Sequence, residues 1–201
     1  MSATATQNER GLAPLERRLH RRTLVRTGAG VAAATVVFVL AIAVTCRLLF
    51  AEQARGWLDF GFDPPAGGPK LHTAWETLSV NAQLAAVCFL FALSVALGRG
   101  GQTTFNVVMY RFCRGLYDLM LGVVYVGNVL IVGVSLGAYG PRMVRALLPH
   151  GPVELFAFSL ALAVYLVARE RGIGLSPALR AGVAVVALLA LAAALETWGA
   201  G

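Results

Sequence analysis

Three acidic side chains stand within or at the edges of long apolar stretches, namely Asp118, Glu154 and Glu196. An ionised group at membrane depth is costly, so each is a candidate functional residue. Arg114 precedes Asp118 by four residues, which places both on one helix face and favours an ion pair at the membrane interface. A proton or ion relay through Asp118 is the alternative interpretation.

His150 likewise precedes Glu154 by four residues, so the two side chains are within hydrogen-bonding reach on a helix. Alternatively, Glu154 stabilises the positive N-terminus of a helix that begins near Pro152. A zinc site needs three or four ligands, and His72 is the one other histidine expected on the same side. We therefore predict no metal site and no cofactor.

The sequence contains none of the common catalytic motifs: no nucleophile elbow, P-loop, HExxH, GxGxxG or kinase signature. The glycine-rich residues 98–101 read as a turn rather than a phosphate-binding loop. Cys46, Cys88 and Cys113 lack paired spacing and lie in or beside apolar or amphipathic runs, so we interpret them as small hydrophobic residues. The chain is therefore predicted not to be an enzyme.

The composition of the chain indicates a membrane protein. Of its 201 residues 58% are hydrophobic and 13% are charged, whereas a soluble domain carries about 25% charged residues. The net charge is +7, carried almost entirely by arginines beside apolar runs. This placement favours an anionic membrane face over nucleic acid, which would call for basic loops with aromatic residues that stack on bases.

Five apolar stretches have the length of a membrane-spanning helix, about 20 residues. They cover residues 28–47, 79–98, 115–140, 152–168 and 179–198. The sequence thus predicts an all-α, polytopic transmembrane helical bundle of five spans over residues 28–201. A basic cytoplasmic or interfacial segment, residues 1–27, precedes it. Six spans follow instead if residues 102–140 cross twice.

The segments between these spans carry further signals. Residues 8–26 place leucines at helical spacing among arginines, which predicts a basic amphipathic helix on the membrane or a flank that only fixes orientation. Residues 48–79 are expected to form a loop around the breaker DPPAGGP at 63–69, with Trp57, Phe60, Phe62 and Trp75 suited to the interface. Residues 102–114 either lie in the interface or extend the third span. A loop is expected over 141–149.

The distribution of basic residues predicts the orientation. One side of the predicted bundle collects most of them: Arg10, Arg17, Arg18, Arg21, Arg22, Arg26, Arg99, Arg111, Arg114, Arg169, Arg171 and Arg180. The positive-inside rule then places the N-terminus in the cytoplasm and, after five spans, the C-terminus outside. The first apolar run lacks a convincing cleavage site and is expected to remain as an anchor.

The segment LLPHGPVELFAF, residues 147–158, carries a Pro-His-Gly-x-x-Glu-Leu motif formed by Pro149, His150, Gly151, Glu154 and Leu155. It resembles the signature of the stage II sporulation protein M family. Glu196 matches that family's late acidic position and Asn81 the asparagine that opens its second helix. Asn128 and Gly133 match an Asn-Gly-x-x-x-Gly motif, in which Val129 replaces the first glycine. The resemblance implies a multi-pass protein of the bacterial cytoplasmic membrane without a known catalytic role.

Two functional hypotheses follow. The first is a non-catalytic integral membrane subunit of a multi-protein envelope or export complex, as the resemblance implies. The second is the permease subunit of an ATP-driven exporter, in which the 102–114 helix contacts a separate ATP-binding subunit through Tyr110, Arg111 and Arg114. Gly133 and Gly137 form a GxxxG motif that allows close helix approach, either to a second copy in a homo-oligomer or within the chain.

Overall fold

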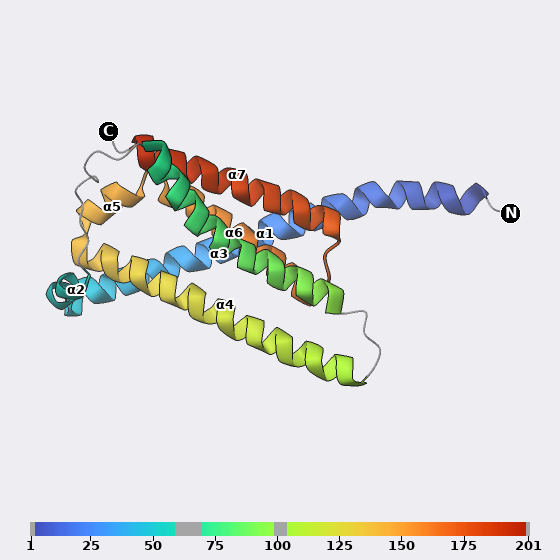
Figure 1. Cartoon of the computed structure of the whole chain (residues 1–201), viewed down its shortest axis with the longest axis horizontal. Coiled ribbons are helices and arrows are strands. Elements are labelled where there is room, and N and C mark those ends of the chain that lie inside the picture. The colour runs from blue at the N-terminus through green and yellow to red at the C-terminus, as the bar shows by residue number, and fades with distance from the viewer. Residues whose placement is uncertain (1–2, 59–69, 99–103, 200–201) are drawn as a thin grey trace.

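Seven helices and no strands make up the part of the chain that the computed structural model describes, residues 3–58, 70–98 and 104–199. Side chains are described over 22–58, 71–95 and 107–198. In chain order the helices are α1 (Ala3–Leu49), α2 (Ala51–Trp57), α3 (Lys70–Gly98), α4 (Thr104–Tyr139), α5 (Pro141–Leu147), α6 (Gly151–Glu170) and α7 (Leu175–Gly199) (Figure 1).

Five of these helices are long and apolar enough to cross a membrane: α1, α3, α4, α6 and α7. The predicted all-α bundle is therefore confirmed, and the architecture is that of a multi-pass membrane protein. The six-span alternative is wrong, because α4 runs without a break from Thr104 to Tyr139. Residues 104–114 extend the third span. At 1.5 Å per residue α4 is about 54 Å long, well beyond the ~30 Å hydrocarbon layer.

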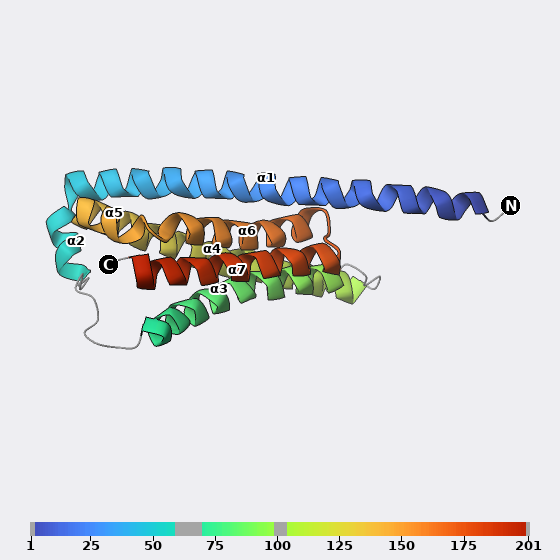
Figure 2. The same cartoon turned by 90° about the horizontal axis from the view of Figure 1, so that it is seen from above.

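The basic segment and the first span form one helix, α1, which has 47 residues. The predicted boundary near residue 27 is therefore not a break in the backbone. Thr27-Gly-Ala-Gly contains no proline, and glycine in a helix costs only about 1 kcal/mol relative to alanine. The N-terminal part of α1 extends beyond the other helices (Figures 1 and 2).

The centre of the bundle is α6, which lies between α1 and α7 and also packs on α3 (Figure 2). Its buried residues include small ones that are fully enclosed, Ala157, Ala161, Ala163 and Ala168. Small side chains let neighbouring helices approach closely, which drives helix association where lipid removes the hydrophobic effect. On α1, Gly28 lies directly over the backbone of α6 at Leu160.

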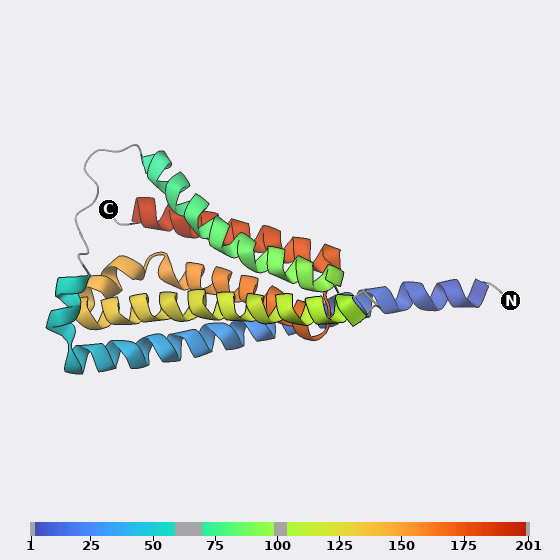
Figure 3. The ribbon, with the colours of Figure 1, turned by 60° about the horizontal axis from the view of Figure 1, so that its bottom comes forward.

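The GxxxG motif of α4 packs on α1 of the same chain, and the two helices run side by side (Figure 3). A Cβ atom added at Gly137 would lie 2.5 Å from the Ala43 carbonyl oxygen and 2.6 Å from Cys46 Cβ. One added at Gly133 would lie 2.8 Å from the Ile42 side chain. Only glycine permits this approach. The GxxxG motif therefore serves helix packing within the chain, which was one of the two alternatives predicted for it.

Two short helices occupy segments that were expected to be loops. The first, α2, turns across the end of the bundle (Figure 3), where Arg55 Nε donates a hydrogen bond to the Ala138 carbonyl at 3.0 Å and Tyr139 Oη donates to the Leu58 carbonyl. The second, α5, begins at Pro141, directly after Gly140, whose φ of 55° ends α4. Proline at a helix start loses no hydrogen bond, which explains why this segment becomes helical.

The expected starts of two spans are also wrong. Helix α3 begins at Lys70 rather than at residue 79, because the polar LHTAWETL sequence contains no helix breaker and continues the apolar helix outward. Helix α7 begins at Leu175 rather than at 179. The breaker at 63–69, Phe60, Phe62 and residues 99–101 lie outside the described residues. Trp57 and Trp75 are exposed, as interfacial side chains would be.

Candidate functional site

A group of polar residues from three helices meets at one end of the bundle; we call Asn81, His150, Glu154 and Glu196 the Glu154 cluster. Asn81 on α3 donates a hydrogen bond from Nδ2 to Glu154 Oε1 at 2.6 Å. All four side chains are partly buried. A short bond to a carboxylate is among the stronger hydrogen bonds in proteins, so it ties α3 to the first turn of α6.

Helix geometry and neighbouring charges both act on the Glu154 carboxyl group. His150 stands at the N-terminal cap of α6, where its carbonyl accepts the backbone N–H groups of Val153 and Glu154. The carboxylate therefore lies beside the positive end of the α6 dipole. Its charge interacts favourably with His150 and unfavourably with Glu196 of α7. The hydrogen bond from Asn81 joins α3 to α6, whereas the charge of Glu196 on α7 opposes that of Glu154.

Other residues of the motif lie beside this cluster or apart from it. Pro149 lies in the turn before α6, and Gly151 is the first residue of that helix. Asn128 is exposed on α4, and its Nδ2 donates to the Val124 carbonyl of its own helix at 2.8 Å. Gly133 serves the contact between α4 and α1. The structure therefore brings four of the predicted motif residues together and leaves Asn128 and Gly133 elsewhere.

A second polar group joins α4 to α6; we call Asp118, Tyr165 and Arg169 the Asp118 cluster. Tyr165 Oη donates to Asp118 Oδ1 at 2.7 Å, and Arg169 Nη2 lies 3.2 Å from Asp118 Oδ2. Tyr165 is only 1% exposed, whereas Asp118 and Arg169 are about one-third exposed. Because Tyr165 and Arg169 are one turn apart on α6, both carboxylate oxygens are held from the same face.

The expected ion pair of Asp118 with Arg114 gives way to this pairing with Arg169. From the sequence, the best candidate partner for Asp118 is its neighbour four residues away. In the folded chain, however, α6 packs so that Arg169 and Tyr165 contact Asp118. Arg114 remains close enough for its charge to act on Tyr165. Next to the cluster, Phe91 of α3 stacks on Tyr117 of α4 with ring centroids 4.1 Å apart.

The three predicted partner-contact residues point in different directions. Arg111 is exposed, Arg114 is partly buried near the Asp118 cluster, and Tyr110 packs against the hydrophobic core. Of the three, Arg111 is therefore the side chain most available to another protein.

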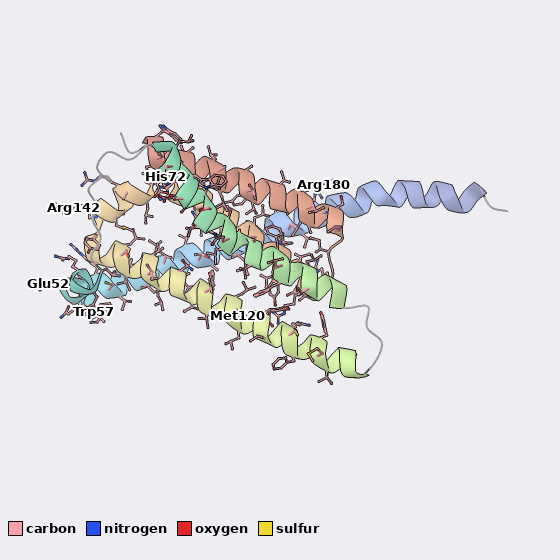
Figure 4. The ribbon with its side chains drawn as sticks, viewed as in Figure 1. Glu52, Trp57, His72, Met120, Arg142 and Arg180 are labelled. Atoms are coloured by element: carbon pink, nitrogen blue, oxygen red, sulfur yellow. The ribbon has the colours of Figure 1, made fainter. Side chains whose placement is uncertain are left out.

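The two clusters occupy opposite ends of α6, since Glu154 and Arg169 are 15 residues apart and a helix rises 1.5 Å per residue, giving about 22 Å. Figure 4 labels His72 and Arg142 at one end of the bundle and Arg180 toward the other. Within the described residues, no group of three or more His, Cys, Asp or Glu side chains is placed to hold a metal ion.

The described part of the chain also has an apolar groove between α3 and α7, lined by Ala82, Ala86, Phe89, Gly182 and Val186 among others. The residues that line it carry no hydrogen-bonding side chain. The cysteines behave as small core residues: Cys46 and Cys88 are buried, while Cys113 is partly exposed. No protein-family model, no curated protein and no solved structure matches this chain.

Proposed function

We propose that this chain is a non-catalytic integral membrane subunit of a multi-protein envelope or export complex, resembling the stage II sporulation protein M family. The observation that carries the proposal is the Glu154 cluster. Asn81, 73 positions before Glu154 in the sequence, donates a hydrogen bond to its carboxylate, and Glu196 of α7 lies close enough for its charge to act on that group. An ionisable residue within a membrane-spanning helix is a candidate functional residue.

The Glu154 cluster fits a recognition role better than a catalytic one. Its hydrogen bond ties α3 to the start of α6, and the exposed side chains of His72 and Glu76 stand on the first turns of α3. Such a rigid, polar helix end presents a defined surface to a partner in or above the membrane.

The proposed setting is the bacterial cytoplasmic membrane, with the N-terminus inside. The distribution of arginines supports this orientation, since Arg169, Arg171 and Arg180 lie at the end of α6 and the start of α7, opposite the Glu154 cluster. The Glu154 cluster then faces outward, toward the envelope. Labelling single cysteines at Glu52 and Arg171 with a membrane-impermeant maleimide tests this, because only the cysteine at position 52 should react in intact cells.

The proposal is tested by purifying the tagged full-length chain in mild detergent and quantifying co-purifying proteins by mass spectrometry. We expect stoichiometric partners with the natural chain and their loss with Asn81→Leu, which removes the donor to Glu154. Glu52→Gln is the matched control, because it removes an exposed carboxylate on α2, outside both the cluster and the α3 surface. A monodisperse natural chain that recovers no partner, or equal loss with the control, would contradict the proposal.

The permease hypothesis has less support. In an ATP-driven permease of this layout, the 102–114 segment would lie along the membrane as a separate helix that meets the ATPase. Here residues 104–114 continue α4 without a break. The hypothesis predicts that Arg111→Ala abolishes stimulation of a co-expressed ATP-binding subunit, and unchanged stimulation would refute it.

A further inference from the structure

The two halves of α4 are held in very different ways. The half that ends at Tyr139 is packed tightly, with Val129, Ser135 and Ala138 buried and the GxxxG motif against α1. A hydrogen bond of 2.8 Å between Thr35 of α1 and Tyr125 of α4 also holds this half. Backbone and side-chain atoms therefore fix this half of the helix from several directions.

The other half, which we call the α4 arm (residues 104–121), is mostly uncovered. Its exposed apolar side chains are Val107, Val108, Met109, Phe112, Leu116, Leu119 and Met120. In a bilayer such side chains contact lipid, so they add little to helix association. Leu121 is the arm's buried apolar residue among those whose side chains are described, and Tyr110 and Tyr117 pack on the core at its edge.

The Asp118 cluster is the strongest polar attachment that the structure describes for this arm. It joins two helices whose backbones have little close contact, because α4 packs mainly on α1, then on α2, and over shorter stretches on α3 and α5. Tyr165 and Arg169 reach Asp118 from α6 at 2.7 Å and 3.2 Å. Just beyond the arm, Gly122 and Gly127 have no atom within 4 Å of an added Cβ, so packing does not explain them. Glycine lowers helix stability by about 1 kcal/mol relative to alanine, so these positions weaken α4 locally.

We propose that the α4 arm is a movable element that the Asp118 cluster latches onto α6. With both carboxylate oxygens engaged, the arm lies against the bundle. When the carboxylate is released, the arm bends away at Gly122, which lies between the arm and the hydrogen bond that holds Tyr125 to α1. Arg111 is exposed on the arm about two turns from Asp118, so a partner that binds it moves with the latch. This last link rests on the proposed function, whereas the latch itself is a property of the isolated chain.

The test uses the full chain in lipid nanodiscs without any partner. Replacing the two buried thiols by Cys46→Ser and Cys88→Ala leaves Cys113 on the arm, and Arg171→Cys adds a second label site at the end of α6. Spin labels at these positions report the distance between arm and α6 by double electron–electron resonance. We expect a single narrow distance distribution in this parent and a second, longer-distance population in Asp118→Asn.

Two further variants keep the test decisive. Tyr165→Phe removes one hydroxyl group and no charge, so it reports on the latch even if Asp118→Asn does not fold. Glu170→Gln removes an exposed carboxylate at the same helix end outside the cluster and should match the parent. Distributions of Asp118→Asn and Tyr165→Phe that superimpose on the parent would overturn the proposal, as would an equal change with Glu170→Gln. A missing partner affects the proposed function and leaves this measurement unchanged.

Discussion

Replacing Gly137 by alanine should have two opposing effects on the stability of the chain. It disturbs the close packing of α4 on α1, and it raises the helix propensity of α4. The added Cβ would sit 2.5 Å from the Ala43 carbonyl oxygen and 2.6 Å from Cys46 Cβ, closer than real Cβ contacts. The carbonyl belongs to the backbone of α1, so the helices themselves must separate. Overpacking of this kind costs about 1–3 kcal/mol.

Alanine also favours the helix over glycine by about 1 kcal/mol, which opposes that cost. Because one of the two close contacts is to backbone, we place the overpacking cost at the upper end of its range. The expected net destabilisation of Gly137→Ala is therefore about 1–2 kcal/mol. Gly133→Ala should also destabilise the chain, since its added Cβ would lie 2.8 Å from Ile42 Cβ, which no change of rotamer moves, and 3.1 Å from the Val39 carbonyl oxygen.

Gly122→Ala is the matched control on the same helix, because no atom lies within 4 Å of its added Cβ. It should be neutral or stabilising by up to about 1 kcal/mol. Reversible unfolding of the purified chain by sodium dodecyl sulfate in mixed micelles measures all three variants. Equal stability of Gly137→Ala and Gly122→Ala would refute the close packing of α4 on α1.

Three further predictions concern the polar groups and thiols. Asn81→Leu should lower the unfolding free energy by about 1.5–3 kcal/mol, the value of a hydrogen bond to a charged group, and calorimetry or micelle unfolding would show it; a change below the measurement error would contradict the bond. Tyr165→Phe should cost a similar amount, because its hydroxyl group donates to a carboxylate, and an unchanged midpoint would argue against the contact. Cys113 should react with a membrane-permeant maleimide in the folded chain, while Cys46 and Cys88 should react only after unfolding; equal labelling of all three would contradict their burial.

Hydropathy alone predicted the five apolar helices, because each needs a continuous stretch that only the bilayer can accommodate. The helix ends were less predictable. Lys70 and Thr104 begin helices in sequence that is polar or amphipathic, so no change of hydropathy marks them. The short helix at Pro141 was missed because proline reads equally as a loop residue and as a helix start.

The partners of the charged residues depended on packing that a single sequence does not contain. For Asp118, the local rule offered Arg114, whereas the structure supplies Tyr165 and Arg169 from another helix. Their i, i+4 spacing on α6 was a usable signal, but nothing in the sequence indicated that α6 faces α4. By contrast, the pairing of Asn81 with Glu154 joins two residues that the motif resemblance had already singled out.

The central place of α6 has a consequence for biogenesis. Helices leave the translocon in chain order, and α6 is the fourth of the five long apolar helices to be made. Until it inserts, α1 lacks the surface that covers Leu24 and Gly28, and α3 lacks one of its two main neighbours. The first and third spans, α1 and α4, can already pair through the GxxxG motif, whereas α3 touches α4 only over a short stretch. In a nascent chain that ends before residue 151, α3 is therefore the span with the least protein contact.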